Sequence, residues 1–431
     1  MIERVRGFRD SYPEDMLPRQ KMFDVMRETA TQFYFSQIEI PSLEYLDLYR
    51  VKSGEELLTQ TFSFTDKGGR ELTMIPEATP SVVRMLTSRK DLKKPVKWFC
   101  LPKLWRYEEP QSGRSREHTQ FNADIFGDSS MFADAEIIGL ACSTLDKLGL
   151  SGKYKVRIND RMLMEKILRD IGISNIARGY SLIDHYRKLS ADDFKSQLLE
   201  LCKESEKADF LLQLLGKEIK LDQLDTKFPE QFKRENEEIV SRLKNTGILV
   251  SKLTSAELVY DASVVRGLGY YTGIVFEGFD RAGEFRSIFG GGRYDNLGQL
   301  IADTPIEAVG FGMGDAVLEL LLKKNNLWNL TTRAGSFAMC TVGNETIITA
   351  YELATKLRQL GYAVNVDTSQ ASLSNQLKKA AANSVNYTII IGPKEIKDNV
   401  LTIRDMNSGT QVTGRMDDLE KLIESVSSKQ I

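Results

Sequence analysis

The chain has 431 residues, of which 42% are hydrophobic and 27% charged, as in a globular protein of two or three domains. The net charge of −2 gives no indication of nucleic-acid binding, so any RNA-binding surface must be local. Four scattered cysteines and two histidines argue against a disulfide framework and against a bound metal. The charged start and the strand-sized apolar runs, such as residues 388–391, predict a cytoplasmic protein with no membrane span.

The first 325 residues fall into three regions that differ in the pattern of their apolar residues and in glycine content. Up to about residue 155, short apolar strands alternate with helical stretches, and Lys67-Gly68-Gly69 marks a hairpin turn. From about residue 159 to 245, leucines recur at three- and four-residue spacing among dense charges, which predicts amphipathic helices. Strand-rich, glycine-rich sequence returns over residues 254–311. We interpret residues 1–325 as one α+β domain with an antiparallel sheet and a helical insertion at about 159–250; three domains in a row is the alternative.

A second domain is expected over residues 335–431, after a linker-like segment at 323–335. The pattern predicts strands at 336–342, 362–366 and 387–391, with helices at 346–360 and 372–382. These elements indicate a small α/β domain whose sheet is mainly parallel. Basic and acidic residues balance there, so charge does not reveal RNA binding.

The most informative stretch covers residues 104–127 and reads LWRYEEPQSGRSREHTQFNADIFG. It predicts two antiparallel strands whose loop carries basic and amide side chains over a site. Guanidinium groups such as those of Arg106, Arg114 and Arg116 can bind phosphate oxygens and offset charge developing at phosphorus. Gln120 and Asp124 are four residues apart, so they share one face of a strand. For Arg114 and Arg116, a hairpin with solvated charges is the alternative.

This stretch resembles motif 2 of the class II aminoacyl-tRNA synthetases, in the form found in histidyl-tRNA synthetases. Other segments resemble motifs of that family in the same order: RGFRDSYPEDM, IEIPSLEYLDLY around Pro41 (the dimer-forming motif 1), MIPEATPSVVR, RGLGYYTGIVFE, and GGGRYDNL with VGFGMGD (motif 3). The C-terminal region resembles the family's anticodon-binding domain. The resemblance implies a homodimeric, ATP-dependent, AMP-forming histidine–tRNA ligase whose partners are L-histidine, ATP with Mg²⁺, and tRNA(His).

The resemblance also assigns residues to histidine. Glu77 and Gln120 are implied at the α-ammonium end, where a carboxylate offers charge-assisted hydrogen bonds. Asp124 and Tyr271 are implied at the two imidazole nitrogens, which a selective site should both engage. The whole implied histidine-binding set is Glu77, Ala78, Thr79, Arg106, Gln120, Asp124, Arg266, Tyr270, Tyr271 and Tyr294. Plain core packing is the alternative for Tyr270 and Tyr271.

For ATP, the resemblance implies two catalytic arginines, Arg106 and Arg266, on opposite sides of the α-phosphate. The implied ATP-binding set is Arg106, Glu108, Arg114, Arg116, Gly312 and Gly314. Glu108 would contact the adenosine or the metal. Magnesium is expected to arrive with the nucleotide, and no permanently bound cofactor is expected. Glycines at 290–292, 310, 312 and 314 allow close backbone approach, as a nucleotide across a sheet needs.

Two positions depart from the family pattern. Val317 stands where the family has a motif 3 arginine that contacts the γ-phosphate, and Gly269 replaces the aspartate of RGLDYY. These departures leave an alternative, a catalytically inert paralogue such as the regulatory subunit of ATP phosphoribosyltransferase, which binds histidine without charging tRNA. That subunit usually lacks an anticodon-binding domain. A third hypothesis is a tRNA-sensing or structural module without chemistry.

Overall fold

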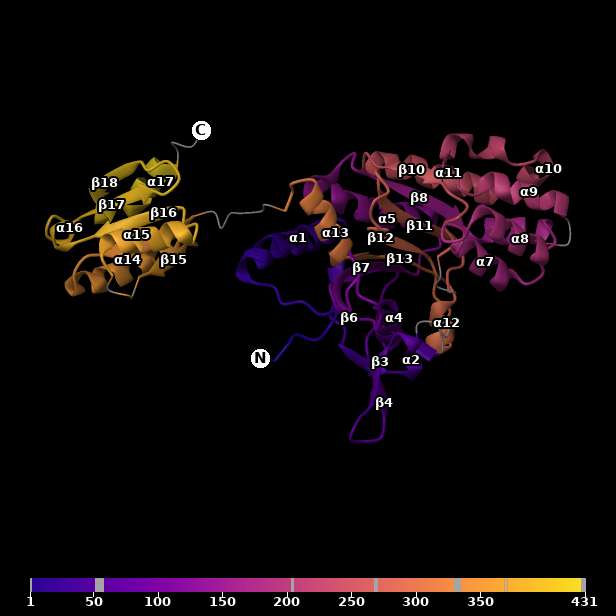
Figure 1. The fold of residues 1–431 in the computed structure, drawn as a ribbon, viewed down its shortest axis with the longest axis horizontal. Coiled ribbons are helices and arrows are strands. Elements are labelled where there is room, and N and C mark those ends of the chain that lie inside the picture. Colours follow the sequence, from indigo (N-terminus) through magenta and orange to yellow (C-terminus); the bar gives the residue numbers. More distant parts are fainter. Residues whose placement is uncertain are drawn as a thin grey trace. The chain divides into compact units, whose positions relative to one another are not determined.

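The computed structural model of the chain divides into two compact units, residues 1–330 and 331–431 (Figure 1). It describes residues 2–50, 58–202, 205–266, 270–328, 335–367, 369 and 371–427. Each unit has its own hydrophobic core. Among the described residues, no helix is long and apolar enough to cross a lipid bilayer.

The N-terminal unit is built on a long sheet with the strand order β1-β5-β7-β13-β12-β11-β8-β10-β9, and β6 pairs with β7. Its strands are β1 (Ser36–Gln37), β5 (Val96–Cys100), β6 (Lys103–Trp105), β7 (Glu117–Phe126), β8 (Tyr154–Asp160), β9 (Ile219–Lys220), β10 (Glu257–Tyr260), β11 (Ile274–Asp280), β12 (Phe289–Arg293) and β13 (Ala308–Gly314). The strands that surround the site, β5 to β11 in this order, pair antiparallel. The prediction of an antiparallel sheet is confirmed.

A smaller sheet has the order β2-β4-β3, formed by β2 (Leu43–Tyr45), β3 (Phe62–Thr65) and β4 (Glu71–Met74). The β3–β4 turn is closed by the Asp66 carboxylate, which accepts hydrogen bonds from the backbone N–H groups of Gly68 (2.8 Å) and Arg70 (2.9 Å). Aspartate stabilises turns in this way because its short side chain reaches the backbone two residues on. The hairpin predicted at residues 67–69 is confirmed.

Strand β7 shows how alternating side chains separate the two faces of the large sheet. Phe121, Ala123 and Ile125 enter the larger core, together with α1 (Pro13–Gln32), α5 (Met131–Leu145) and α13 (Asp315–Lys324). The residues between them point to the other face, because successive side chains of a strand alternate. That face, here called the site face, is covered by α4 (Thr79–Thr87) and α12 (Leu297–Ala302), with α2 (Asp47–Arg50) beside α4.

A block of helices lies between β8 and β10 in the sequence. In space it lies near the end of the sheet that β8 and β10 form (Figure 1). It contains α6 (Arg161–Asp170), α7 (Ile176–Asp184), α8 (Ala191–Leu201), α9 (Ser205–Leu214), a 3₁₀ turn (Leu221–Lys227), α10 (Glu230–Glu235) and α11 (Glu237–Leu253). Its periodic apolar residues, such as Leu163, Leu198 and Leu243, are buried in the same core as the sheet. The block therefore shares the hydrophobic core of the N-terminal unit.

The C-terminal unit has a five-stranded sheet in the order β15-β14-β16-β17-β18. Its elements are β14 (Ser336–Thr341), α14 (Ile347–Gln359), β15 (Ala363–Val366), α15 (Leu373–Ala382), β16 (Tyr387–Ile391), α16 (Pro393–Lys397), β17 (Val400–Asp405), β18 (Gln411–Arg415) and α17 (Leu419–Ser427). The predicted strands and helices are confirmed.

The expectation of a mainly parallel sheet in this unit is wrong. Strands β14, β15 and β16 are parallel, but β17 and β18 join antiparallel. The reason is the length of the connections: only residues 392–399 join β16 to β17, and only 406–410 join β17 to β18. A parallel pair needs a crossover of about a dozen residues or more.

Candidate active site

Glycines of β12 and β13 form the floor of the site face. Across three neighbouring strands, Gly290 pairs with Gly312, which pairs with Asn122; one step along, Gly292 pairs with Gly310, which pairs with Asp124. A Cβ at Gly310 would overlap the Asp124 carboxylate, and one at Gly312 would overlap the Gln120 amide. Gln120 and Asp124 therefore share one face of β7, as predicted, and these glycines make room for their side chains.

Above this floor lies a small hollow of about 60 Å³, here called the inner cavity. It is lined by Glu77, Thr79, Arg106, Gln120, Asn122, Arg266, Tyr270, Tyr271, Gly290, Tyr294, Gly310, Phe311 and Gly312. The structure thus brings together eight members of the predicted histidine-binding set. Asp124 is 1% exposed and lies beside the cavity, while Ala78 is buried before α4 and lines neither this cavity nor the next.

Two buried tyrosines donate hydrogen bonds to the carboxylates in and beside the inner cavity. The Tyr270 hydroxyl donates a hydrogen bond to Glu77 Oε1 (2.6 Å), and the Tyr294 hydroxyl donates one to Asp124 Oδ1. Burial raises the pKa of both hydroxyls well above the usual range, so both stay protonated donors. The Tyr270 and Tyr271 rings lie 4.7 Å apart, so this pair both packs in the core and lines the cavity.

Arg106 and Arg266 stand where the inner cavity meets a second one, because both line each. The Arg106 Nε donates to the Pro76 carbonyl (2.9 Å), and Arg266 Nη1 pairs with Glu277 Oε1 (2.9 Å). Burial lowers the pKa of Arg266, but nearby Tyr271 and Glu277 outweigh this effect and raise it, so the guanidinium stays charged. Its backbone φ of 54° is strained for a residue with a side chain.

The second hollow, here called the outer cavity, measures about 220 Å³. It is lined by Arg106, Glu108, Gly113, Arg114, Ser115, His118, Gln120, Arg266, Arg286, Ser287, Ile288, Phe289, Gly290, Gly312, Gly314, Ala316 and Val317. Five members of the predicted ATP-binding set are among them. Arg114 Nη2 donates to Glu108 Oε1 (2.6 Å), so this pair carries little net charge into the cavity.

Arg116, the remaining member of that set, lies outside both cavities. Its Nε donates to the Glu108 carbonyl (3.1 Å), and its guanidinium lies 4.0 Å from the centre of the Tyr107 ring. Its backbone N–H donates to the Gly7 carbonyl (2.8 Å), which ties the N-terminal segment to the β6–β7 loop. In this structure Arg116 therefore contributes to the fold of the loop, and its role in binding ATP stays a prediction.

Asn122, His118 and Arg286 line the cavities without having been predicted. His118 and Asn122 lie two residues either side of Gln120, so the period of a strand could have indicated them. Burial, followed by the charge of nearby Arg106, lowers the pKa of His118 to about 3, so its imidazole is neutral. Arg286 follows a turn and carries no periodic signal. Gly269 lies outside the described residues.

The N-terminal segment helps to hold the wall of the outer cavity. Asp315, the first residue of α13, has a fully buried side chain that pairs with Arg9 (2.7 Å) and Arg19 and accepts from the Thr119 backbone N–H (3.2 Å). These contacts fix α13, and with it Val317, against β7. Among the described residues, no group of three or more His, Cys, Asp or Glu side chains is arranged to hold a metal ion.

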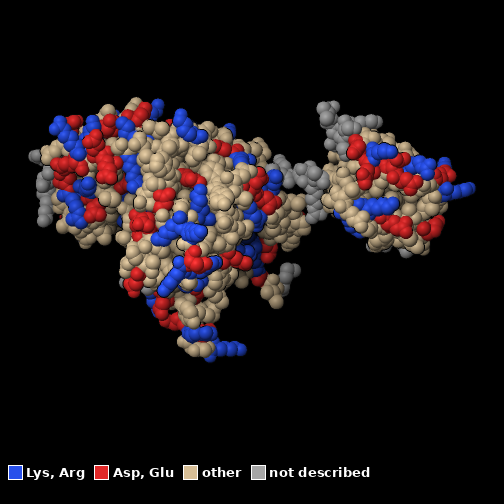
Figure 2. Space-filling view, turned by 180° about the vertical axis from the view of Figure 1, so that it is seen from behind, with Lys and Arg blue, Asp and Glu red and all other residues tan. Residues whose placement is uncertain are grey.

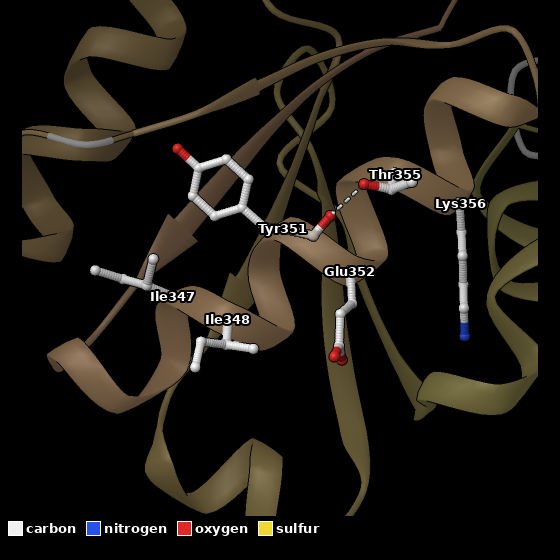
Figure 3. Close-up of a pocket in the computed structure, with 6 residues that line it drawn as sticks. All are labelled: Ile347, Ile348, Tyr351, Glu352, Thr355 and Lys356. Atoms are coloured by element: carbon white, nitrogen blue, oxygen red, sulfur yellow. Dashed lines mark hydrogen bonds between the residues drawn. The ribbon is translucent and has the colours of Figure 1, made fainter.

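A further hollow, about 540 Å³, lies in the C-terminal unit and is open to solvent (Figure 3). Its lining comes from α14 alone: Ile347, Ile348, Tyr351, Glu352, Thr355 and Lys356. Thr355 Oγ1 donates to the Tyr351 carbonyl within the helix (2.8 Å). This hollow brings together no group of titratable side chains comparable to that around the inner and outer cavities.

The antiparallel sheet, with two arginines between a small polar pocket and a wider basic one, has the fold of the catalytic unit of a class II aminoacyl-tRNA synthetase. The family model described as Histidyl-tRNA synthetase matches residues 7–315, and the model described as Anticodon binding domain matches residues 337–426. This chain belongs to the histidyl-tRNA synthetase family and is an aminoacyl-tRNA ligase. The family predicted from the order of the sequence motifs is confirmed.

The chain is similar to relatives along its whole length. It is 48% identical to the histidine–tRNA ligase of Picrophilus torridus, over 98% of this chain and 100% of the relative. It is 45% identical to that of Thermoplasma volcanium, over 99% of each. Because these relatives match through both units, the alternative of an inert regulatory paralogue is not favoured.

Two solved structures share the fold. The histidyl-tRNA synthetase from Nostoc sp. PCC 7120 has a TM-score of 0.85 at 21% identity, covering 99% of each chain. A Bacillus halodurans C protein described as an ATP phosphoribosyltransferase regulatory subunit/histidyl-tRNA synthetase has a TM-score of 0.74 at 24% identity, covering 91% of this chain and 98% of its own.

Proposed function

We propose that this chain, as a histidine–tRNA ligase, activates L-histidine in the inner cavity with ATP held in the outer one, and then transfers histidine to the 3′ end of tRNA(His). The observation that carries the proposal is that Arg106 and Arg266 line both cavities. A carboxylate in one cavity and an α-phosphate in the other would meet between these two guanidinium groups.

The inner cavity suits an amino acid with a polar ring. Glu77 and Gln120 offer acceptors to an α-ammonium group, and charge makes the Glu77 contact the stronger. Asp124 and Tyr271 are proposed for the two imidazole nitrogens, with Tyr270 and Tyr294 as walls and Thr79 at the edge. Because Tyr294 donates to Asp124, the carboxylate is oriented before a ligand arrives.

In the reaction, a histidine carboxylate oxygen bonds to the α-phosphorus, and the bond to the bridging oxygen breaks to release pyrophosphate. Negative charge grows on the α-phosphate oxygens, and the two arginines are placed to stabilise it, each by about 3 kcal/mol. Magnesium enters as part of the substrate, Mg–ATP, and Glu108 is a proposed contact for the adenosine or the metal. No covalent intermediate with the protein is needed, so positioning and charge supply the acceleration.

We further propose that the C-terminal unit binds the anticodon and that the chain works as a cytoplasmic homodimer through the segment around Pro41. The match of residues 337–426 to an anticodon-binding domain supports the first part. Figure 2 shows basic and acidic side chains interspersed on the face of the C-terminal unit that it presents, so recognition through this face would depend on local contacts.

The proposed homodimer has a general ground, because a C₂ dimer is the commonest closed assembly. A monomer at micromolar concentration by light scattering would exclude this assembly.

The decisive experiment is histidine-dependent exchange of labelled pyrophosphate into ATP by the purified chain. We expect exchange with histidine and none with other amino acids. Arg106→Ala should abolish most of it, whereas Arg169→Ala should not, because Arg169 pairs with Glu165 on the exposed face of α6. Histidine binding without exchange would instead support the inert paralogue.

A further inference from the structure

The arginines of the outer cavity differ in how their charge is balanced. Arg114 pairs with Glu108, and Arg266 pairs with Glu277. Arg286 lines the same cavity with an exposed side chain, and within the part of the chain that the structure describes it forms no ion pair or hydrogen bond. It therefore brings an uncompensated positive charge to this cavity.

The loop between β11 and β12 holds Arg286 in place from both sides. Before it, the Asp280 carboxylate accepts hydrogen bonds from the backbone N–H groups of Glu284 (3.0 Å) and Phe285 (2.9 Å). After it, the Ile288 N–H donates to the Gly278 carbonyl (2.8 Å). The backbone that carries Arg286 is thus ordered without a ligand, so binding has only the side chain left to order.

The same loop is also clamped to α13, which forms another wall of the cavity. Lys324 of α13 pairs with Glu284 (2.5 Å), and its Nζ lies 5.6 Å from the centre of the Phe285 ring. The part of α13 that lines the cavity consists of Ala316 and Val317, so α13 itself presents no cation there. The neighbouring loop does.

Position along the cavity indicates which part of ATP Arg286 would meet. Arg106 and Arg266 stand at the junction with the inner cavity, where the α-phosphate reacts, whereas Arg286 lines only the outer cavity. We propose, resting on the function proposed above, that Arg286 binds the β- and γ-phosphates of ATP, the pyrophosphate that leaves. Val317 lines the same cavity without a charge, so the cation at this position comes from the loop.

A contact of this kind acts on the bound nucleotide before and after the reaction. Hydrogen bonds to a charged partner contribute enough that losing one weakens binding by roughly ten- to a hundredfold. Arg286→Ala should therefore weaken Mg–ATP binding and pyrophosphate inhibition by that factor. The affinities for AMP and for histidine should not change, because neither ligand has β- or γ-phosphates. Arg286→Lys should fall between the two proteins.

The test is calorimetric titration of the full-length protein with Mg–ATP, AMP and histidine. The matched control is Arg281→Ala. Arg281 starts the same loop, pairs with Glu257 (2.9 Å) and lines neither cavity. This variant should therefore bind all three ligands like the wild-type protein. Selective loss of Mg–ATP affinity in Arg286→Ala supports the contact. Unchanged Mg–ATP affinity, or equal losses for ATP and AMP, would overturn it. Wild-type protein that does not bind ATP would overturn the proposed function as well, so the two failures are distinguishable.

Discussion

Replacing Arg266 by alanine separates the catalytic role of this residue from its role in the fold. Arg266 lies between the two cavities, 19% exposed, and its partner Glu277 is 22% exposed. Loss of one preorganised charge contact to a transition state costs about 3 kcal/mol, or roughly a hundredfold in rate. We therefore expect adenylate formation by Arg266→Ala to fall by about a hundredfold or more.

The same substitution leaves the Glu277 carboxylate without its cation. Burial already raises the pKa of Glu277, and removal of Arg266 takes away the largest opposing effect, so its pKa rises further. When the pKa of a carboxyl group is higher in the folded protein than in the unfolded one, the free energy of unfolding falls as pH rises from the unfolded pKa to the folded pKa. We expect a loss of about 1–2 kcal/mol at pH 8, discounted for partial exposure, and a smaller loss at pH 5.

Two assays and one double variant decide the matter. Single-turnover adenylate formation measures the chemical step, and urea unfolding at pH 5 and 8 measures the free energy of unfolding. Adding Glu277→Gln to Arg266→Ala should recover stability at pH 8 without recovering the rate. A folded Arg266→Ala protein with a near-normal rate would refute the placement of the α-phosphate between the arginines.

Three further outcomes are expected. Asp124→Ala should raise the KM for histidine about tenfold or more and leave that for ATP nearly unchanged in pyrophosphate exchange, with Tyr271→Phe milder, because an unpaired buried polar group costs about 1–3 kcal/mol; equal effects on both substrates would contradict this. A fragment of residues 1–330 should keep histidine activation but charge tRNA poorly, since both cavities lie in the first unit; charging as efficient as that of the full chain would exclude a role for the C-terminal unit. His118→Gln should reduce the loss of stability between pH 6.5 and 4 in urea unfolding, because His118 stays neutral in the fold to about pH 3 and is protonated below about 6.5 when unfolded; an unchanged slope would mean that His118 is solvated.

Periodicity and motif order in the sequence were sufficient for the family, the antiparallel catalytic sheet and the elements of the C-terminal unit. They were also sufficient for the shared face of Gln120 and Asp124, because side-chain alternation is a local property of any strand. Most of the other residues predicted for the two cavities lie in loops or at the start of α4, and the order of the family motifs, not a strand period, indicated them.

Only the tertiary structure decided which charged groups meet. Arg116 looked like Arg114 in the sequence, yet it packs on Tyr107 and binds the Glu108 carbonyl, whereas Arg114 lines the outer cavity. The glycines of β12 and β13 looked like room for a nucleotide, yet Gly310 and Gly312 first admit side chains from the neighbouring strand. Arg286 had no signal, because a loop has no period and its place depends on anchors to Asp280 and α13. Local chemistry sets which way a strand residue faces, while long-range pairing sets what it faces.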